Sequence, residues 1–405
     1  MRVLYLTHRL PYAPNRGDRI RAYHMLRELS RWADVELFSL VHDDEEMAHA
    51  AEVPFASSVV TARVPHVGNH IRGALRLTSS QPLTHSLLDS PEAREKLTAI
   101  VVAYRPDVVL AYCSSMARFA VEPPLDRLPF VLDMVDVDSQ KWQRLSKQAA
   151  WPLSSVYSRE TRTLAAAERA MSERARTVLV VSEHEREVLS QLAPRARIEV
   201  VPNGVDVESF RPTLPPAVEP VVVFTGRMDY RPNVEAVTWF AAQIWPHVVA
   251  ARPDARFVIV GDRPARPVRT LAERDRSIQV TGRVGAVQPH LWRSAVAVAP
   301  LLTARGLQNK VMESLAAGVP VVLTPGVLAG LPHGVEKGCS VADGADAWIK
   351  AVLDMLSLSP AARRSLAQAS QVDALSWSAQ LAGLPSILRA AVAREGFQAA
   401  AFRAG

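Results

Sequence analysis

The segment TARGLQNKVMESLAAGVPVV (303–322) combines a helical apolar pattern with several polar residues at its start. Leu307, Val311 and Leu315 form a stripe at i, i+4 and i+8, which predicts a helix that begins near Gly306 and packs on a sheet. Unpaired N–H groups at a helix N-terminus bind anions, so we predict a diphosphate site here. The residues assigned to this site are Gly306, Leu307, Gln308, Asn309, Lys310 and Glu313.

Two of these residues carry charge. Lys310 suits a phosphate. Glu313 suits a ribose diol, because its carboxylate could accept hydrogen bonds from the two hydroxyl groups. The alternative is that they form only an exposed ion pair, three residues apart on one helix and worth a few tenths of a kcal/mol.

Two arginines follow another predicted strand. In FTGRMDYRPN (224–233), Gly226 ends the strand, and Arg227 and Arg231 come after it. A planar guanidinium can bind two phosphate oxygens at once, so both arginines suit a diphosphate. The alternative for Arg231 is an ordinary exposed arginine.

A glycine also follows the first predicted strand. In THRLPYAPNRGDRIR, Gly17 stands at a strand-to-helix turn, where the missing Cβ lets a ligand approach the backbone. The alternative is an ordinary connecting loop. The full GxGxxG fingerprint is absent, which argues against a dinucleotide cofactor.

Three carboxylates lie near the end of one more predicted strand, in LDMVDVDSQKW (132–142). They are Asp133, Asp136 and Asp138. An Asp-x-Asp pair can hold a divalent metal on a diphosphate, but such short matches arise by chance and Asp138 also suits a helix N-cap. We predict no metal site, and we expect at least one of these residues to face a ligand cleft.

Parallel sheets must position these motifs, because short β-branched runs alternate with helical stretches along almost the whole chain. The predicted fold class is α/β, with two Rossmann-like doubly wound domains. Such domains bind ligands at the carboxyl ends of their strands, and two that face each other would enclose an interdomain cleft. Residues 138–175 are predicted to be mostly helical. The predicted strands are 2–6, 35–41, 58–64, 107–112, 129–135, 177–182, 221–226, 255–261, 278–282, 295–300 and 319–324.

The length of 405 residues also favours two domains, each of roughly 200 residues. Residues 200–220 hold five prolines and an Asn-Gly pair, which is typical of a connecting segment. We predict an N-terminal domain at 1–200 and a C-terminal domain at 201–375. A helical tail at 376–405 is expected to pack back across the first domain.

The composition is that of a folded protein, with 48% hydrophobic residues, 22% charged residues and a net charge of +6. This small surplus suits a phosphate-bearing ligand or an anionic membrane surface, and no basic run interleaved with aromatic residues indicates nucleic acid. Cys113 and Cys339 are the only cysteines and lie far apart, so the sequence indicates neither a disulfide framework nor a zinc site. This cysteine usage fits a protein of the reducing cytoplasm. The first apolar run is broken by His8, Arg9 and Pro11, unlike a signal peptide, and no apolar stretch reaches roughly 20 residues.

These motifs together resemble the retaining glycosyltransferase family 4, whose fold consists of two Rossmann domains and is called GT-B. A subgroup of sugar transferases associated with exosortase/PEP-CTERM systems and bacterial exopolysaccharide is similar in GDRIR, DMVDVDSQKW, MDYRPN and RGLQNKVMES. The family resemblance rests on the Gly17 loop, VPNGVD (201–206), FTGRM (224–228), TGRV (281–284) and above all KVMESLAAGVPVV (310–322).

The resemblance implies a nucleotide-sugar donor bound mostly by the C-terminal domain and an acceptor bound mainly by the N-terminal one. Glu313 would be the second Glu of an E-x7-E motif and would bind the ribose. Arg227 and Lys310 would stabilise the diphosphate leaving group. Gly17 would approach the phosphates from the opposite domain. Metal is not normally required in this family.

Two positions depart from the family pattern. The first Glu of E-x7-E should stand where this chain has Arg305, which could contact a phosphate or an acidic sugar. On a continuous helix, positions 305 and 313 would lie about 12 Å apart. Many relatives carry a His near 133–138, and here Asp136 is the nearest candidate, either to orient the acceptor hydroxyl or to stabilise positive charge on the sugar.

The main hypothesis is a cytoplasmic, metal-independent retaining glycosyltransferase without a cofactor. It would move a sugar from a UDP- or GDP-linked donor to a lipid-linked or polysaccharide acceptor, with any contact to the inner membrane being peripheral. The alternatives are a nucleotide-sugar 2-epimerase of the same fold and a non-catalytic nucleotide-sugar-binding partner, which the arginine at 305 makes conceivable.

Overall fold

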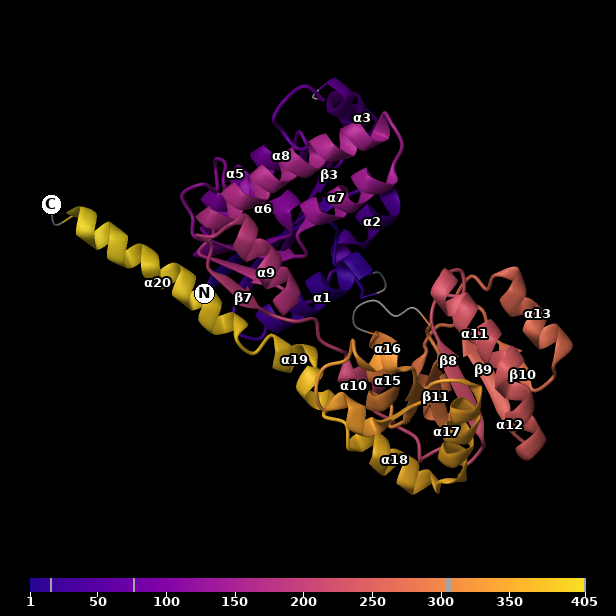
Figure 1. Ribbon diagram of the computed structural model, residues 1–405. Helices are drawn as coiled ribbons and strands as arrows, with labels where there is room; N and C mark the ends of the chain where they lie inside the picture. The colour runs from indigo at the N-terminus through magenta and orange to yellow at the C-terminus, as the bar shows by residue number, and fades with distance from the viewer. Residues whose placement is uncertain (15–16, 76, 303–307, 404–405) are drawn as a thin grey trace. The chain divides into compact units, whose positions relative to one another are not determined.

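The chain divides into two compact units, Met1–Gly204 with Gln380–Gly405 (unit 1) and Val205–Ala379 (unit 2), each described separately below (Figure 1). The computed structural model describes residues 1–14, 17–75, 77–302 and 308–403.

Unit 1 is built on a parallel sheet with the strand order β3-β2-β1-β4-β5-β6-β7. The central strands are buried on both faces, as their continuous apolar sequences predict for a parallel sheet. The strands described are β1 (Arg2–Thr7), β2 (Asp34–Val41), β3 (Ser58–Arg63), β4 (Val108–Tyr112), β5 (Phe130–Val135), β6 (Thr177–Val180) and β7 (Ile198–Val200).

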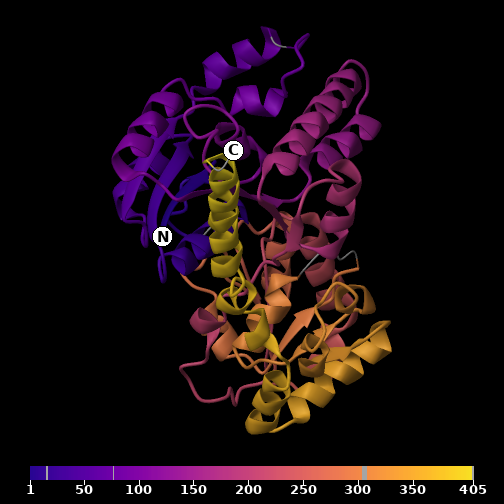
Figure 2. The same ribbon diagram turned by 90° about the vertical axis from the view of Figure 1, so that its left-hand side faces the viewer.

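Helices cover both faces of this sheet. One face packs against apolar residues of α5, α6, α8 and α9. The last helix, α20, contacts β4 and β5, and it buries Leu384, Leu388 and Ala391 (Figure 2). The helices are α1 (Gly17–Leu29), α2 (Asp44–Ala48), α3 (His66–Leu75), α4 (Leu83–Leu87), α5 (Ala93–Tyr104), α6 (Ser114–Ala120), α7 (Asp138–Gln148), α8 (Leu153–Arg174), α9 (Glu183–Leu192) and α20 (Leu384–Arg403), with a 3₁₀ turn at His49–Glu52.

Unit 2 has a second parallel sheet, with the order β10-β9-β8-β11-β12-β13. Its strands are β8 (Val221–Thr225), β9 (Arg256–Val260), β10 (Ile278–Val280), β11 (Val296–Ala299), β12 (Val321–Leu323) and β13 (Cys339–Val341). Its helices are α10 (Val207–Phe210), α11 (Arg231–Gln243), α12 (Trp245–Ala251), α13 (Arg266–Arg274), α14 (Gln288–Trp292), α15 (Asn309–Ala316), α16 (Pro325–Leu328), α17 (Ala345–Ser357) and α18 (Pro360–Gln368), with 3₁₀ turns at Val335–Gly338 and Val372–Leu375; α19 (Trp377–Gln380) lies at the boundary with unit 1.

The two sheets confirm the predicted α/β class and all the predicted strands. The sequence patterns missed β7 and β13, which have only three residues each and are the last strands of their sheets. The helical stretch predicted at 138–175 is two helices, α7 and α8, which pack against each other. Across the described residues, no helix combines the length and the apolar character needed to cross a bilayer.

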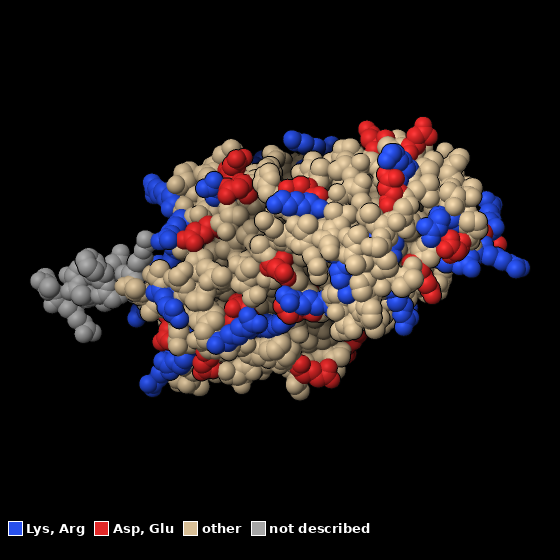
Figure 3. Space-filling view, turned by 90° about the horizontal axis from the view of Figure 1, so that it is seen from below, with Lys and Arg blue, Asp and Glu red and all other residues tan. Residues whose placement is uncertain are grey.

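Acidic and basic side chains alternate on one face of the molecule. Figure 3 shows acidic and basic side chains interspersed over the face that it presents. Mixed charge of this kind is typical of a surface in contact with water.

Candidate functional site

The sheet of unit 2 has one topological switch point, between β8 and β11. From β8 the chain proceeds outward to β9 and β10, and it then returns to β11 on the other side of β8. The loops that leave β8 and β11 therefore diverge, and such a divergence opens a crevice at the carboxyl end of a parallel sheet. Gly226 and Arg227 follow β8, and Lys310 and Glu313 follow β11, so the structure brings these predicted residues to one crevice.

Gly226 is the most closely surrounded residue of this crevice. Its φ is +154°, and a Cβ built on it would lie 2.8 Å from Asn233 Nδ2 and 3.2 Å from Lys310 Nζ. Its own carbonyl oxygen would lie 1.7 Å from a Cβ on Gly261, which follows β9. Two neighbouring strand ends are thus packed backbone against backbone, and glycine is required at both positions.

Asn233 connects the two sides of the crevice. It lies in the first turn of α11, is 6% exposed, and accepts a hydrogen bond of 2.7 Å from Lys310 Nζ. Its own Nδ2 donates to the carbonyl oxygen of Arg227 at 2.9 Å. The Asn233 side chain therefore fixes the position of the lysine ammonium relative to the backbone that follows β8.

The Lys310 ammonium has neutral partners. Besides Asn233, it lies 4.2 Å from the centre of the Phe224 ring, at the end of β8. No ion pair joins it to Glu313 among the described residues, so the simple exposed pair considered above is not what the structure shows. Burial lowers the pKa of Lys310 to about 7, although the Glu313 carboxylate opposes this. A cation held by an amide oxygen and a ring face keeps its charge available for an anion.

Glu313 lies one turn along the same helix and is partly buried. Burial raises its pKa to about 7, and the charge of Lys310 opposes this rise. A carboxyl group that can be protonated or ionised near neutral pH can accept or donate a hydrogen bond to a hydroxyl.

The two predicted arginines differ in position. Arg227 lines an open pocket of about 460 Å³ together with Asp229, Tyr230 and Asn233. Its exposed guanidinium forks onto Asp229, with distances of 3.1 and 2.8 Å. Arg231 does not line this pocket; its side chain is 89% exposed and pairs with Glu235 one turn along α11, at 2.7 Å.

Helix α15 begins at Asn309, three residues later than predicted, after Gln308 as N-cap. Asn309 is exposed, and the side chain of Gln308 does not cap the helix. Val311 and Leu315 are buried against the sheet, as the apolar stripe predicts. The predicted residues Arg305, Gly306 and Leu307 lie outside the described residues.

Unit 1 has a switch point of its own, between β1 and β4. Gly17 is the first residue of the helix that follows β1. The loop between them is tied down by the buried carboxylate of Glu46, which accepts hydrogen bonds from Leu10 N at 3.1 Å, His42 N at 2.9 Å and Arg19 Nη2 at 3.0 Å. His8 leaves β1 and stacks on Tyr112 at the end of β4, with ring centres 5.5 Å apart.

The three predicted aspartates have different surroundings. Asp133 is fully buried and binds the guanidinium of Arg21 through both oxygens, at 2.8 and 2.9 Å. It therefore supports the fold rather than facing a ligand. Asp136 is exposed just beyond β5, and the protein around it together with the Glu185 carboxylate raises its pKa above the usual value. Asp136 is therefore accessible to a ligand, whereas Asp133 is not.

A strained turn presents Asp136. Val135, a β-branched residue, has a φ of +66°, and the pairing of β5 with β6 is interrupted between Asp133 and Val135. Glu185 accepts a hydrogen bond from Val137 N at 2.9 Å and so fixes this turn. Backbone strain at a strand end often marks a functional position.

The last aspartate belongs to a buried polar cluster. Asp138 accepts a hydrogen bond from Ser114 Oγ at 3.4 Å, and burial raises its pKa. Glu168 of α8 accepts from the N–H of Ser139 at 3.2 Å, and burial raises its pKa to about 8. In the described parts of the chain, no three His, Cys, Asp or Glu side chains are grouped as metal ligands would be.

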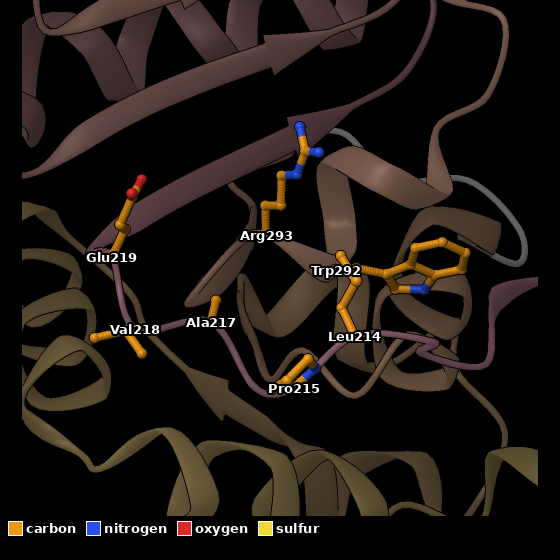
Figure 4. Close-up of a pocket in the computed structure, with 7 residues that line it drawn as sticks. All are labelled: Leu214, Pro215, Ala217, Val218, Glu219, Trp292 and Arg293. Atoms are coloured by element: carbon orange, nitrogen blue, oxygen red, sulfur yellow. The ribbon is translucent and has the colours of Figure 1, made fainter.

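A further pocket, of about 360 Å³, lies away from these strand ends (Figure 4). Its lining residues precede β8 and β11, so it opens at the amino ends of these strands. Figure 4 shows the side chains of Glu219 and Arg293 pointing away from the segment of Pro215 and Val218. Since ligands of doubly wound sheets bind at the carboxyl edge, this pocket is not the candidate site.

Comparison with known families identifies the class of protein. Residues 16–204 match the glycosyl transferase 4-like domain, and residues 219–358 match the glycosyl transferases group 1. Together these models match most of the chain, and the chain belongs to the glycosyltransferases that carry these two domains. No curated protein sequence matches it.

Solved structures of the same architecture cover nearly the whole chain. Sucrose-phosphate synthase from Thermosynechococcus elongatus is similar over 98% of this chain and 100% of its own, with a TM-score of 0.61 and 18% identity. The N-terminal domain of Candida albicans trehalose-6-phosphate phosphatase has a TM-score of 0.64 at 13% identity, over 96% of this chain and 97% of its own. Anabaena HepE, solved in complex with UDP and glucose, has a TM-score of 0.58 at 15% identity, over 96% of this chain and 99% of its own. The fold is therefore GT-B.

Sequence reasoning missed Asn233, Phe224 and Arg21. Asn233 is 77 residues from Lys310 along the chain, and Arg21 is 112 residues from Asp133, so no local pattern relates them. The one available signal was a short amide residue in the first turn of a helix that follows a glycine-ended strand.

Proposed function

We propose that this protein is a retaining glycosyltransferase that transfers a sugar from a UDP- or GDP-linked donor to a lipid-linked or polysaccharide acceptor. The pathway would be exopolysaccharide or cell-surface glycan synthesis, as in the exosortase-associated subgroup that the sequence resembles. The observation that carries the donor assignment is the Lys310 ammonium, held by neutral groups beside Gly226 at the switch point of unit 2. Support for a nucleotide sugar comes from HepE, which has the same fold and was solved with UDP-glucose.

The donor diphosphate would lie against the start of α15. Lys310 contributes charge, and the N–H groups in the first turn of this helix, which begins at Asn309, contribute dipoles. Arg227 reaches the same phosphates once its guanidinium leaves Asp229. Glu313 binds the ribose hydroxyls. The other residues that the family resemblance assigns to the donor are Gly17, Arg305, Gly306 and Leu307.

Catalysis would rest on charge. Breaking the bond between the sugar and the diphosphate places negative charge on the leaving phosphate, and Lys310 and Arg227 stabilise that charge without a divalent metal. The leaving phosphate itself helps to take the proton of the acceptor hydroxyl, so that no strong protein base is needed. Asp136 orients this hydroxyl or stabilises positive charge on the sugar. Attack from the same face as the leaving group retains the anomeric configuration.

A thermal-shift screen of nucleoside diphosphates and their sugars tests the donor site. A ligand at a hundred times its Kd stabilises the folded state by about 2.7 kcal/mol, which raises the melting temperature measurably. We expect a shift with UDP or GDP and their sugars, and a much smaller shift in Lys310→Met. The matched control is Lys350→Met, because Lys350 is exposed on α17 and pairs with Asp354. A wild-type protein without a shift for any of these ligands contradicts the proposal.

Product analysis distinguishes the alternatives. A glycosyltransferase releases the nucleoside diphosphate, slowly with water and faster with an acceptor, and Lys310→Met slows both reactions. Conversion of UDP-GlcNAc into its 2-epimer without an acceptor identifies an epimerase. Binding without any turnover identifies a non-catalytic partner.

A further inference from the structure

Five large apolar side chains are exposed at one end of unit 1. Val67 and Ile71 stand one turn apart on α3, with exposed fractions of 79% and 60%, and Leu77 follows at 40%. Trp151 is 81% exposed in the turn between α7 and α8, and Leu153 is 54% exposed at the start of α8. Both views of the ribbon place α3 and this turn at the same, upper end of unit 1 (Figures 1 and 2). Single exposed apolar residues are ordinary, but several at one end mark an interaction surface.

The two elements that carry these residues are tied together within unit 1. Arg159 of α8 donates a hydrogen bond to the carbonyl oxygen of Gln81 at 2.8 Å. Glu160, fully buried, accepts from the N–H of Leu83 at 2.7 Å and from that of Thr84 at 2.9 Å, at the start of α4. The connection after α3 is therefore fixed to the side of α8, and the exposed residues belong to one rigid end.

This end is also free of acidic side chains along two long segments. Neither 53–88 nor 139–159 contains an Asp or Glu. On α7, Lys141, Arg144 and Lys147 recur at i, i+3 and i+6, and all three are exposed. This differs from the mixed charge on the face seen in Figure 3. The α7–α8 pair, held by the contact of Trp142 with Tyr157 at 5.3 Å between ring centres, thus presents a basic stem and an apolar tip.

We propose that this end of unit 1, the basic-apolar end, binds the surface of a membrane that contains anionic lipids. An exposed indole at the tip suits the headgroup level, because it has an apolar body and one N–H group for the polar layer. Exposed apolar residues on α3 add buried area, and the basic stem is attracted to anionic headgroups. Because these two segments lack carboxylates, they do not repel anionic headgroups as a surface with acidic side chains would. This inference goes beyond the proposed function, since it needs neither donor nor acceptor.

Vesicle co-sedimentation of the full chain tests the inference. Vesicles are made of phosphatidylcholine alone or of phosphatidylcholine mixed with phosphatidylglycerol. We expect binding to the mixed vesicles, little binding to the neutral ones, and weaker binding as salt is added. The double variant Trp151→Ser/Leu153→Ser should bind about tenfold more weakly, because it loses apolar area at the tip. The triple variant Lys141→Gln/Arg144→Gln/Lys147→Gln should lose about fivefold per charge.

The matched control is Val102→Ser, which removes a side chain of 69% exposure from α5. It should bind vesicles as the wild type does. All these residues are exposed, so unchanged melting temperatures verify that the variants are folded. Failure of the wild type to bind the mixed vesicles at low salt overturns the inference. Unchanged vesicle binding of Trp151→Ser/Leu153→Ser also overturns it. So does a loss of vesicle binding in the charge variant alone, if the wild type binds heparin as tightly as it binds the mixed vesicles, because this would indicate a general polyanion-binding surface. The donor screen described above is independent of all these outcomes.

Discussion

Replacing Lys310 by methionine should remove the loss of nucleotide-sugar affinity that we expect as the pH rises. In the ligand-free protein, burial lowers the pKa of this lysine to about 7 against the attraction of Glu313. A diphosphate beside Nζ favours the ammonium form, so binding raises the pKa again. Above about pH 7 the protein must therefore take up a proton in order to bind, and the affinity falls as the pH rises.

The magnitude follows from the size of the shift. A full return from about 7 to the ordinary value of 10.5 corresponds to about 5 kcal/mol, which is an upper limit for the linkage. Between pH 7 and pH 9 the expected increase in Kd is about fiftyfold, because the lysine is already half deprotonated at pH 7 and the slope approaches tenfold for each pH unit only above it. The methionine variant should bind weakly at both pH values and show no such slope.

Glu313 must be separated from this effect. Burial raises its pKa to about 7, so its carboxylate forms over the same range. If the carboxylate accepts hydrogen bonds from the ribose, its ionisation strengthens binding as the pH rises, which is opposite in sign to the effect of Lys310. The slope should therefore be steeper in Glu313→Gln than in the wild type.

Isothermal titration calorimetry with the nucleotide sugar that gives the largest thermal shift measures these slopes. A sugar-linked diphosphate has no proton to lose in this range, whereas a free diphosphate does. Repeating the titration in buffers with different ionisation enthalpies counts the protons taken up. Lys350→Met serves as the control and should keep the wild-type slope. The reasoning is refuted if the wild-type Kd is constant from pH 7 to pH 9, or if Lys310→Met retains the wild-type slope.

Three further variants test other contacts. Gly226→Ala places a Cβ 2.8 Å from Asn233 Nδ2 and should weaken donor binding by about 1–3 kcal/mol in calorimetry, whereas Gly344→Ala, with φ +78° but open space around its Cβ, should leave binding unchanged. Asp229→Asn removes the ion pair that occupies Arg227 and should tighten donor binding a few-fold; an unchanged Kd would mean that Arg227 does not reach the diphosphate. Arg21→Met leaves the buried Asp133 carboxylate without its cation and should lower the free energy of unfolding by about 3–5 kcal/mol in a urea titration, while adding Asp133→Leu should recover most of the loss. If the double variant is as unstable as Arg21→Met alone, the bonds of Arg21 to Pro202 and Asn203 carry the stability instead.

Most strands could be predicted from the sequence because strands of a parallel sheet are buried on both faces and therefore read as apolar runs. The three-residue strands β7 (IEV) and β13 (CSV) contain polar residues at the margins of their sheets, so the same criterion could not find them. The start of α15 was placed too early because an apolar stripe fixes which face is buried and not where the first turn closes.

The candidate site was predictable in part for a similar reason. Gly226 and Arg227 directly follow β8, Lys310 and Glu313 lie on the helix that comes after β11, and parallel strands bring their carboxyl ends to one edge. The sequence does not show which residue will contact each charged side chain in the fold. Asp133 looks like a ligand-facing carboxylate until the fold places Arg21 on it, and the role of Asn233 exists only when β8 and β11 are neighbours.

The return of the chain to unit 1 through α20 has a consequence for biosynthesis. Unit 2 is a single continuous stretch of chain, whereas unit 1 needs its last helix to cover β4 and β5. During translation, unit 2 can fold as soon as Ala379 has left the ribosome, while the first 204 residues must wait without the helix that packs on β4 and β5. Unit 2 should therefore be obtainable alone as the fragment 205–379, and a fragment that ends at 204 should aggregate unless the helix is supplied as a separate peptide.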